Sequence, residues 1–145
     1  MRALLDVNVI IALHDPSHTH GELAHEWWSE NSSKGWASCP ISEIGFIRIS
    51  SGPRYSPETR FTPGDCIEML SAFIERNDHE FWPDSVSFSH KETFSGDLIA
   101  TPRQLTDIYL LALAVKNGGR LVTFDRRITI ASVIGAAPQH LCILS

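Results

Sequence analysis

The stretch RALLDVNVII, residues 2–11, joins a short apolar run to a second apolar pattern across one aspartate. The run 2–5 predicts a buried strand that ends at Asp6. Residues 7–13 then carry apolar side chains at helical spacing, which predicts a helix directly after the strand. A strand that leads straight into a helix is the β–α unit of a parallel sheet. This stretch therefore predicts an α/β fold.

A second strand of the same kind lies near the other end of the chain, where LVTFD occupies residues 121–125. It follows a helix that is predicted to begin at 101–104 and to run to Val115, and that is expected to be buried because its residues are apolar nearly all round. Thr101, followed by a proline and by Gln104, predicts a capping box at the start of that helix. The run Asn-Gly-Gly at 117–119 predicts its end.

The remaining elements complete one predicted domain over residues 1–145, with a short parallel sheet flanked by helices. Proline and glycine residues predict a loop at 51–63, and a short strand is expected near Phe81 or Val86. No internal repeat or linker is found in the sequence. Further helices are predicted over 18–30, 40–50 and 64–77, and further strands over 35–38 and 141–144.

Composition narrows the functional class. The chain has 145 residues, 12 Lys and Arg against 17 Asp and Glu, and a net charge of −5. This acidity argues against a protein that coats nucleic acid through a broad basic surface, but not against an enzyme that holds phosphates through metal ions. Its three cysteines form no C-x-x-C pair, and its longest apolar run, 108–115, is too short to span a bilayer. These features predict a soluble, cytoplasmic protein without a membrane anchor.

Four carboxylates are the candidate functional residues. Asp6 and Asp125 each follow an apolar strand, and ligands of parallel sheets bind at the carboxyl ends of strands. Asp107 leads into the most apolar helix of the chain, where a carboxylate is unfavourable unless it faces a polar site. Glu43 lies near the first turn of another mostly apolar helix.

Carboxylates gathered at one edge predict a site for a hard cation, since Mg²⁺ and Mn²⁺ prefer oxygen ligands. Three of these residues, taken alone, also have an ordinary explanation, whereas Asp107 is the least easily explained in that way. Asp6 or Asp125 can cap a helix, and Glu43 suits a first turn because of the helix dipole. The argument for a metal site therefore depends on the set, and the number of ions stays open between one and two.

Four blocks of this sequence resemble the PIN domain family, and within it the VapC-type toxins of bacterial toxin–antitoxin pairs. They occur in the order of that family and cover most of the chain, whereas residues 51–100 match only loosely. The blocks are LLDVNVI at 4–10, CPISEIGFIR at 39–48, LTDIYLLALA at 105–114 and GGRLVTFD at 118–125.

The resemblance implies an endoribonuclease that depends on Mg²⁺ or Mn²⁺, cleaves RNA phosphodiester bonds, and is inhibited by a cognate VapB-type antitoxin. It also implies a homodimer. By position in the motifs, Asp6 and Asp107 correspond to the principal metal-binding carboxylates, and Glu43 and Asp125 to the other acidic positions. The polar residues that accompany them, expected to orient the carboxylates, are Asn8 and Thr123.

Other features are less specific. Arg126 and Arg127 are candidate RNA contacts because they follow Asp125. The histidines at 14, 18, 20 and 25 match no recognised zinc spacing, and the pair Trp27 and Trp28 is expected in the core or an interface rather than stacked on bases. Two alternatives stay open: a metal-dependent phosphohydrolase acting on small molecules, and a non-catalytic module whose acidic pocket binds a partner.

Overall fold

A five-stranded parallel sheet forms the centre of the molecule in the computed structural model, which describes residues 1–53, 55 and 60–145. The strand order is β3-β2-β1-β4-β5, and every neighbouring pair is parallel. The α/β parallel fold predicted from the sequence is therefore confirmed. The strands are β1 (Ala3–Leu5), β2 (Trp36–Ser38), β3 (His79–Phe81), β4 (Arg120–Thr123) and β5 (Leu141–Ile143).

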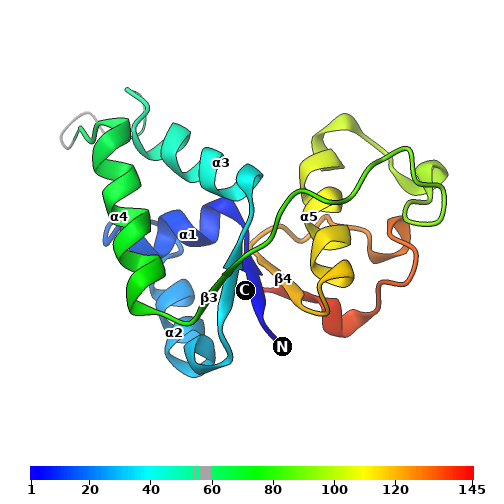
Figure 1. Cartoon of the computed structure of the whole chain (residues 1–145), viewed down its shortest axis with the longest axis horizontal. Helices are drawn as coiled ribbons and strands as arrows, with labels where there is room; N and C mark the ends of the chain where they lie inside the picture. Colours follow the sequence, from blue (N-terminus) through cyan, green and yellow to red (C-terminus); the bar gives the residue numbers. More distant parts are fainter. Residues whose placement is uncertain (54, 56–59) are drawn as a thin grey trace.

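Helices cover both faces of this sheet. Figure 1 shows α1 to α4 on one side of the strands and α5 on the other. These helices are α1 (Val7–His14), α2 (Gly21–Asn31), α3 (Pro40–Ser50), α4 (Pro63–Arg76) and α5 (Leu105–Lys116), and short 3₁₀ turns occupy 32–34, 96–98, 102–104, 130–132 and 138–140.

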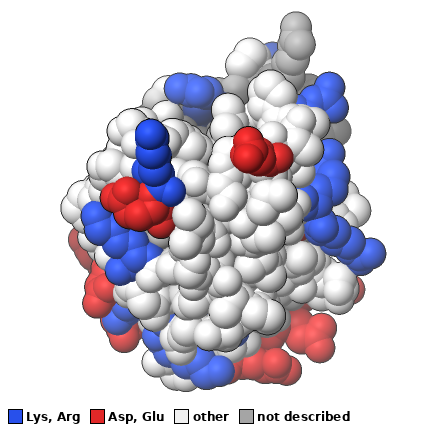
Figure 2. Space-filling model, turned by 90° about the vertical axis from the view of Figure 1, so that its right-hand side faces the viewer, with Lys and Arg blue, Asp and Glu red and all other residues white. Residues whose placement is uncertain are grey.

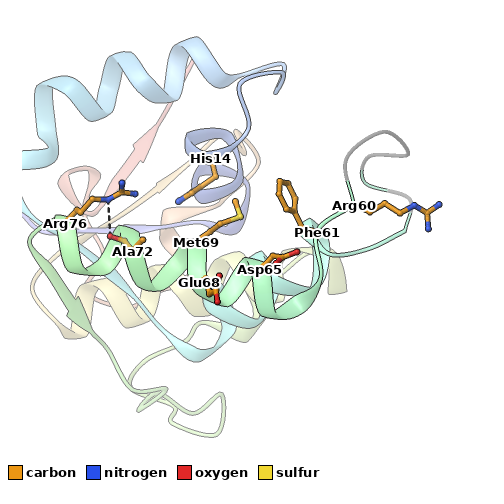
Figure 3. Close-up of a pocket in the computed structure, with 8 residues that line it drawn as sticks. All are labelled: His14, Arg60, Phe61, Asp65, Glu68, Met69, Ala72 and Arg76. Atoms are coloured by element: carbon orange, nitrogen blue, oxygen red, sulfur yellow. Dashed lines mark hydrogen bonds between the residues drawn. The ribbon is translucent and has the colours of Figure 1, made fainter.

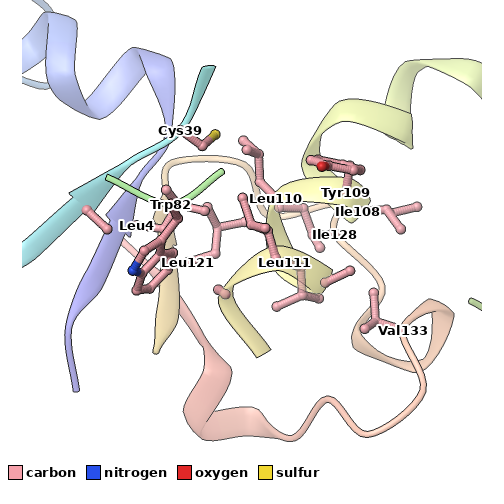
Figure 4. Close-up of a cluster of buried hydrophobic side chains, with 14 of the residues drawn as sticks. Leu4, Cys39, Trp82, Ile108, Tyr109, Leu110, Leu111, Leu121, Ile128 and Val133 are labelled. Carbon is pink, nitrogen blue, oxygen red and sulfur yellow. The ribbon is translucent and has the colours of Figure 1, made fainter. Parts of the chain in front are cut away.

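Successive side chains of a strand point to opposite faces of the sheet, so the core consists of two clusters. Leu4 and Leu121 point toward α5, whose residues 108–114 are all buried. Figure 4 shows this packing of strand leucines against α5. Leu5 and Val122 belong to the opposite cluster, under α1, α3 and α4. Because both faces of β1 are covered, its residues are apolar without a break.

Close contact between α1 and α3 depends on Gly45. A Cβ atom at this position would lie 2.6 Å from Cγ2 of Val7 and 3.3 Å from Cγ1 of the same residue. Any larger side chain would therefore push the two helices apart. Since Glu43 is on α3 and Asp6 caps α1, this contact sets how the two acidic residues are arranged.

The starts of two helices differ from the sequence prediction by more than one residue. The capping box expected at Thr101 is wrong, because a 3₁₀ turn precedes α5 and Thr101 makes no side-chain capping bond. Gln104 instead accepts a hydrogen bond from the amide of Ala100 and donates one to the carbonyl of Arg127. The helix predicted over 18–30 begins only at Gly21, so His18 and His20 lie in the turn before it.

Several other predictions are confirmed. The strand expected near Phe81 is β3, and Gly118 ends α5 with a φ of 69°. Trp27 and Trp28 are half-buried and pack against the core, as expected. The predicted loop at 51–63 lies partly outside the described residues.

The charged side chains that the structure describes on one face of the molecule are scattered and form no broad basic surface (Figure 2), as expected from the net acidity of the chain. Figure 2 shows one face of the molecule, on which a broad uncharged area separates scattered acidic and basic side chains. That face therefore offers no continuous basic surface to a nucleic-acid backbone. Among the described residues, no helix combines the length and apolarity needed to cross a membrane.

Candidate functional site

Asp6 lies at the carboxyl edge of the sheet, where β1 and β4 are neighbours. It is only 8% exposed, and both of its carboxylate oxygens are bonded. The backbone amide of Val7 donates to Oδ1 at 2.8 Å, and the buried Thr123 hydroxyl donates to Oδ2 at 2.8 Å. Thr123 thus orients Asp6, as the sequence predicts. The aspartate is both a helix cap and a member of the acidic edge.

Thr123 also connects Asp6 to the second aspartate of this edge. The backbone amide of Asp125 donates to Thr123 Oγ1 at 3.1 Å. The Thr123 hydroxyl therefore acts both as a donor, to the carboxylate of Asp6, and as an acceptor, from the backbone amide of Asp125.

Asp125 is held in turn by Arg127. Oδ1 accepts from the Arg127 amide at 2.8 Å and from its Nε at 3.1 Å, and Oδ2 accepts from a terminal guanidinium nitrogen at 3.2 Å. These bonds to a guanidinium hold the pKa of Asp125 below its ordinary value. Asp125 is therefore ionised at neutral pH.

Asp107 comes to the same edge from the first turn of α5. Burial is the main reason that its pKa is raised to about 7, and the charge of Asp6 and a hydrogen bond to Asp125 add to that increase. Burial also raises the pKa of Asp6, and the charge of Asp125 adds to it. The structure therefore brings together Asp6, Asp107 and Asp125, and their mutual repulsion would be relieved by a cation.

Glu43 has a different neighbourhood. The Ser38 hydroxyl, at the end of β2, donates to Glu43 Oε2 at 2.5 Å, and His79 Nε2 lies 2.8 Å from the same hydroxyl. Because Ser38 has one proton and gives it to Glu43, His79 must be the donor in its own bond. Burial lowers the pKa of His79, which favours the neutral imidazole. Glu43 is thus oriented from β2 and β3.

Sequence reasoning missed Ser38 and His79. Ser38 carried the signal that identified Asp6, namely a polar residue at the end of a buried strand. No local pattern in the sequence identifies His79, because its hydrogen-bond partner, Ser38, is 41 positions away in the chain.

The donor set fits a hard divalent cation, because all four side chains offer carboxylate oxygens and three of them repel one another. In the described part of the chain, no three His, Cys, Asp or Glu side chains form a ready-made metal-binding group. The acidic edge is therefore a set of coupled carboxylates rather than a preformed coordination shell. Its members are Asp6, Asp107 and Asp125, with Glu43 bound to Ser38.

A hollow of about 570 Å³ opens beside Asp125. Asn8 and Arg126 are exposed on its wall. Among the described residues, no hydrogen bond joins the Asn8 side chain to a carboxylate, so its orienting role stays a prediction. The lining residues are Asn8, His18, His20, Phe124, Asp125, Arg126 and Arg127.

A hollow of about 610 Å³ lies elsewhere, along α4, and contains none of the predicted site residues. Figure 3 shows its lining side chains. Two of them have structural roles: Asp65 caps α4 by accepting from the Thr62 amide, and Arg76 donates to the carbonyl of Ala72. His14 packs between Phe46 and Phe73 rather than standing free in the hollow.

Comparison with known proteins identifies the family of the chain. Residues 3–133 match the model of the PIN domain. The chain is 44% identical to Ribonuclease VapC44 of Mycobacterium tuberculosis (strain ATCC 25618 / H37Rv), and the match covers 99% of this chain and 100% of that protein. It is 43% identical to Ribonuclease VapC39 of the same strain, over 93% of this chain and 96% of the relative. A third relative, Ribonuclease VapC38, is 42% identical over 96% of each protein.

The family match covers all four residues of the predicted acidic site. Two of them, Asp6 and Asp125, follow neighbouring strands of the sheet, and Asp107 is on the first turn of α5. The resemblance first indicated by four sequence blocks therefore extends over most of the chain. The chain belongs to the PIN domain family.

Proposed function

We propose that this protein is the toxin of a VapBC-type pair and acts as a metal-dependent endoribonuclease in the cytoplasm. One observation carries the proposal: Asp6 and Asp125 meet through the Thr123 hydroxyl at the carboxyl edge of the sheet, and Asp107, whose pKa is raised by burial, lies close enough for their charges to raise that pKa further. The names of the relatives, all ribonucleases, support RNA as the substrate. Clustered carboxylates are the ligands that metal-dependent nucleases use.

In the proposed mechanism, Asp6, Asp107 and Asp125 would hold Mg²⁺ or Mn²⁺, and Glu43 would be a further acidic ligand. When bound, such an ion lowers the pKa of a water molecule and offsets negative charge on a phosphodiester. Thr123 keeps Asp6 aimed into the site through its 2.8 Å hydrogen bond. Ser38 does the same for Glu43.

The two arginines after Asp125 have separate roles in this proposal. Arg127 is exposed but bound to Asp125, and it keeps that carboxylate ionised and correctly oriented. Arg126 is exposed beside the same hollow and contacts a phosphate of the RNA.

We also propose inhibition by a VapB-type antitoxin and assembly as a homodimer. The bonds from the Arg127 guanidinium to Asp125 support this proposal, because an antitoxin arginine would bind a carboxylate of the acidic edge in the same way. Exposed apolar side chains on α3 and α4, such as Ile44, Ile49 and Ile67, offer a surface for association. Sedimentation of the isolated protein tests the dimer, and a monomer at micromolar concentration would contradict it.

Cleavage of total cellular RNA by the purified, antitoxin-free protein tests the central proposal. We expect discrete fragments with Mg²⁺ or Mn²⁺ and none with EDTA. In Asp107→Asn the rate should fall about 100-fold or more, because even residues that only support metal ligands cost about 10- to 100-fold. Asp97→Asn makes the same change at an exposed aspartate outside the site, and it should cleave like the parent.

The two alternative functions predict a different result in this cleavage experiment. A small-molecule phosphohydrolase and a non-catalytic acidic module would both leave RNA intact while the protein is folded and metal is present. Equal cleavage by the parent and Asp107→Asn proteins would contradict the site assignment.

A further inference from the structure

We propose that the hollow beside Asp125 is a base-binding subsite, in which a nucleobase of the RNA next to the cleaved phosphodiester stacks on Phe124, His18 and His20. This inference rests on the proposed ribonuclease function and goes beyond it, because it assigns residues that recognise the substrate rather than cleave it. Two of its three rings come from the histidine-rich segment that matches no zinc motif.

Three aromatic rings form the platform. The ring of His20 lies 4.8 Å from that of Phe124 at an angle of 32°, and the ring of His18 lies 6.2 Å from it at 20°. The two histidine rings are 5.9 Å apart. Phe124 is half-buried and packs against the core, so the platform stands on a rigid base. Flat, partly exposed rings are what single-stranded nucleic acids stack on.

The turn that presents the two histidines is held by its own backbone. The amide of His18 donates to the carbonyl of Asp15 at 3.1 Å, and the amide of Gly21 donates to the carbonyl of His18 at 3.0 Å. Asp15 Oδ1 also accepts from the Ser17 amide at 2.9 Å. A platform ordered before the RNA arrives loses less conformational entropy on binding.

A further hydrogen bond within this turn determines which nitrogen of His18 acts as the acceptor. The amide of His20 donates to His18 Nδ1 at 3.0 Å, so this nitrogen acts as an acceptor. Since Nδ1 accepts, the ring proton lies on Nε2, which is left to donate in the plane of the ring to an acceptor of the RNA other than the stacked base. The platform therefore offers stacking together with one directional polar contact.

His20 has no competing structural task in the described residues. It occupies the N-cap position of α2, where Ser, Thr, Asp or Asn normally bonds the helix amides, yet its side chain makes no capping bond. Its ring is exposed and turned to Phe124 instead.

The platform and the acidic edge are adjacent. Phe124 directly precedes Asp125, and both line the same hollow. Arg127 is engaged by Asp125, whereas no ion pair involves Arg126 among the described residues. A base on the rings, a phosphate at Arg126 and the cleaved phosphodiester at the carboxylates would then belong to neighbouring nucleotides.

A fluorescent base tests this arrangement. The cleavage site is first mapped with the parent protein, and an oligonucleotide across it is made with 2-aminopurine at each nucleotide flanking the cleaved bond in turn. In the Asp107→Asn protein, which binds without cutting, we expect the fluorescence to be quenched at one of the two positions. His20→Ala and Phe124→Leu should each reduce that quenching and weaken binding about tenfold.

Two controls make the experiment decisive. His90→Ala removes an exposed histidine from a different hollow and should bind and quench like its parent. Thermal unfolding checks that each variant is folded, and the exposed His20 keeps the test valid even if Phe124→Leu is unstable.

The outcomes separate the two proposals. RNA that is cleaved by the parent and bound by Asp107→Asn, but with no quenching at either position or with full affinity in His20→Ala, overturns the subsite and leaves the ribonuclease intact. A parent protein that neither cleaves nor binds RNA overturns the proposed function itself.

Discussion

Thr123 is the residue on which the acidic edge depends most directly. Its hydroxyl joins Asp6 and Asp125, although the first partner is 117 positions away in the chain. The residue is fully buried, so water cannot replace a lost bond. The stability of the protein and the geometry of its carboxylates should therefore respond to the same hydroxyl group.

Thr123→Val keeps the shape of the side chain but removes the hydroxyl. Because the buried carboxylate of Asp6 then loses a donor, we expect the free energy of unfolding to fall by about 1–3 kcal/mol. Urea unfolding measures this loss. Thr123→Ser retains the hydroxyl and is the matched control. A Val variant as stable as the Ser variant would show that the bond to Asp6 does not stabilise the fold.

Asp107 should give the metal-free protein an unusual dependence on pH. Its folded-state pKa of about 7 lies above the value of 3.8 for an ordinary aspartate, so the folded protein holds this proton more tightly than the unfolded chain does. The stability that this group contributes is therefore complete below about pH 4 and is lost as the pH rises through about 7. Burial lowers the pKa of His14 and of His79, and both act in the opposite sense.

To isolate this effect, the thermal unfolding of the parent protein is compared with that of Asp107→Asn in EDTA at several pH values. We expect the difference in melting temperature, variant minus parent, to grow from pH 4 to pH 8. Added Mg²⁺ should raise the melting temperature of the parent more at pH 8 than at pH 5, since the metal binds the ionised carboxylate. A difference that does not change with pH would mean that Asp107 titrates normally.

At the scale of the elements, contacts between neighbouring helices and strands decide how the acidic residues are presented. Glu43 is on α3, yet its hydrogen-bond partner is on β2 and the next partner is on β3. The position of α3 itself depends on its contact with α1, where Gly45 meets Val7.

Gly45→Ala tests that contact. In an unstrained helix this change would stabilise the protein by about 0.5–1 kcal/mol. Here the new Cβ would lie 2.6 Å from a Val7 methyl, and we expect a net loss of about 1–3 kcal/mol. Val7→Ala in the same chain should restore part of the lost stability, because it removes the clashing methyl groups.

Denaturant unfolding of the single and double variants provides the measurement. Gly96→Ala is the control, since no atom lies within 4 Å of a Cβ built there. If Gly45→Ala were as stable as its parent, the two helices would have room to separate without cost.

At the scale of the whole molecule, a two-sided core places the functional edge. Residues of β1 alternate between the cluster under α5 and the cluster under α1, α3 and α4, so the strand is covered on both faces. Its carboxyl end leads directly to Asp6, which is hydrogen-bonded to Thr123 on the neighbouring strand. The charges of Asp6, Asp107 and Asp125 are therefore concentrated at one place, in a protein whose net charge is −5.

The sequence by itself determined the fold class and the members of the acidic edge. Asp6 and Asp125 were identifiable because each follows an apolar strand, and Asp107 because a carboxylate is unfavourable in an apolar helix. Such patterns are local, spanning a few residues, and they are carried by the chain before it folds.

The tertiary structure alone decided which of these residues meet. The approach of Asp107 to Asp6 and Asp125, the link from His79 through Ser38 to Glu43, and the rings around Phe124 all join separate elements. The start of α5 was mispredicted for the same reason, since Gln104 bonds to Arg127 from a distant turn. Strand order and helix packing set these distances, and neither is written in the local pattern of apolar and polar residues.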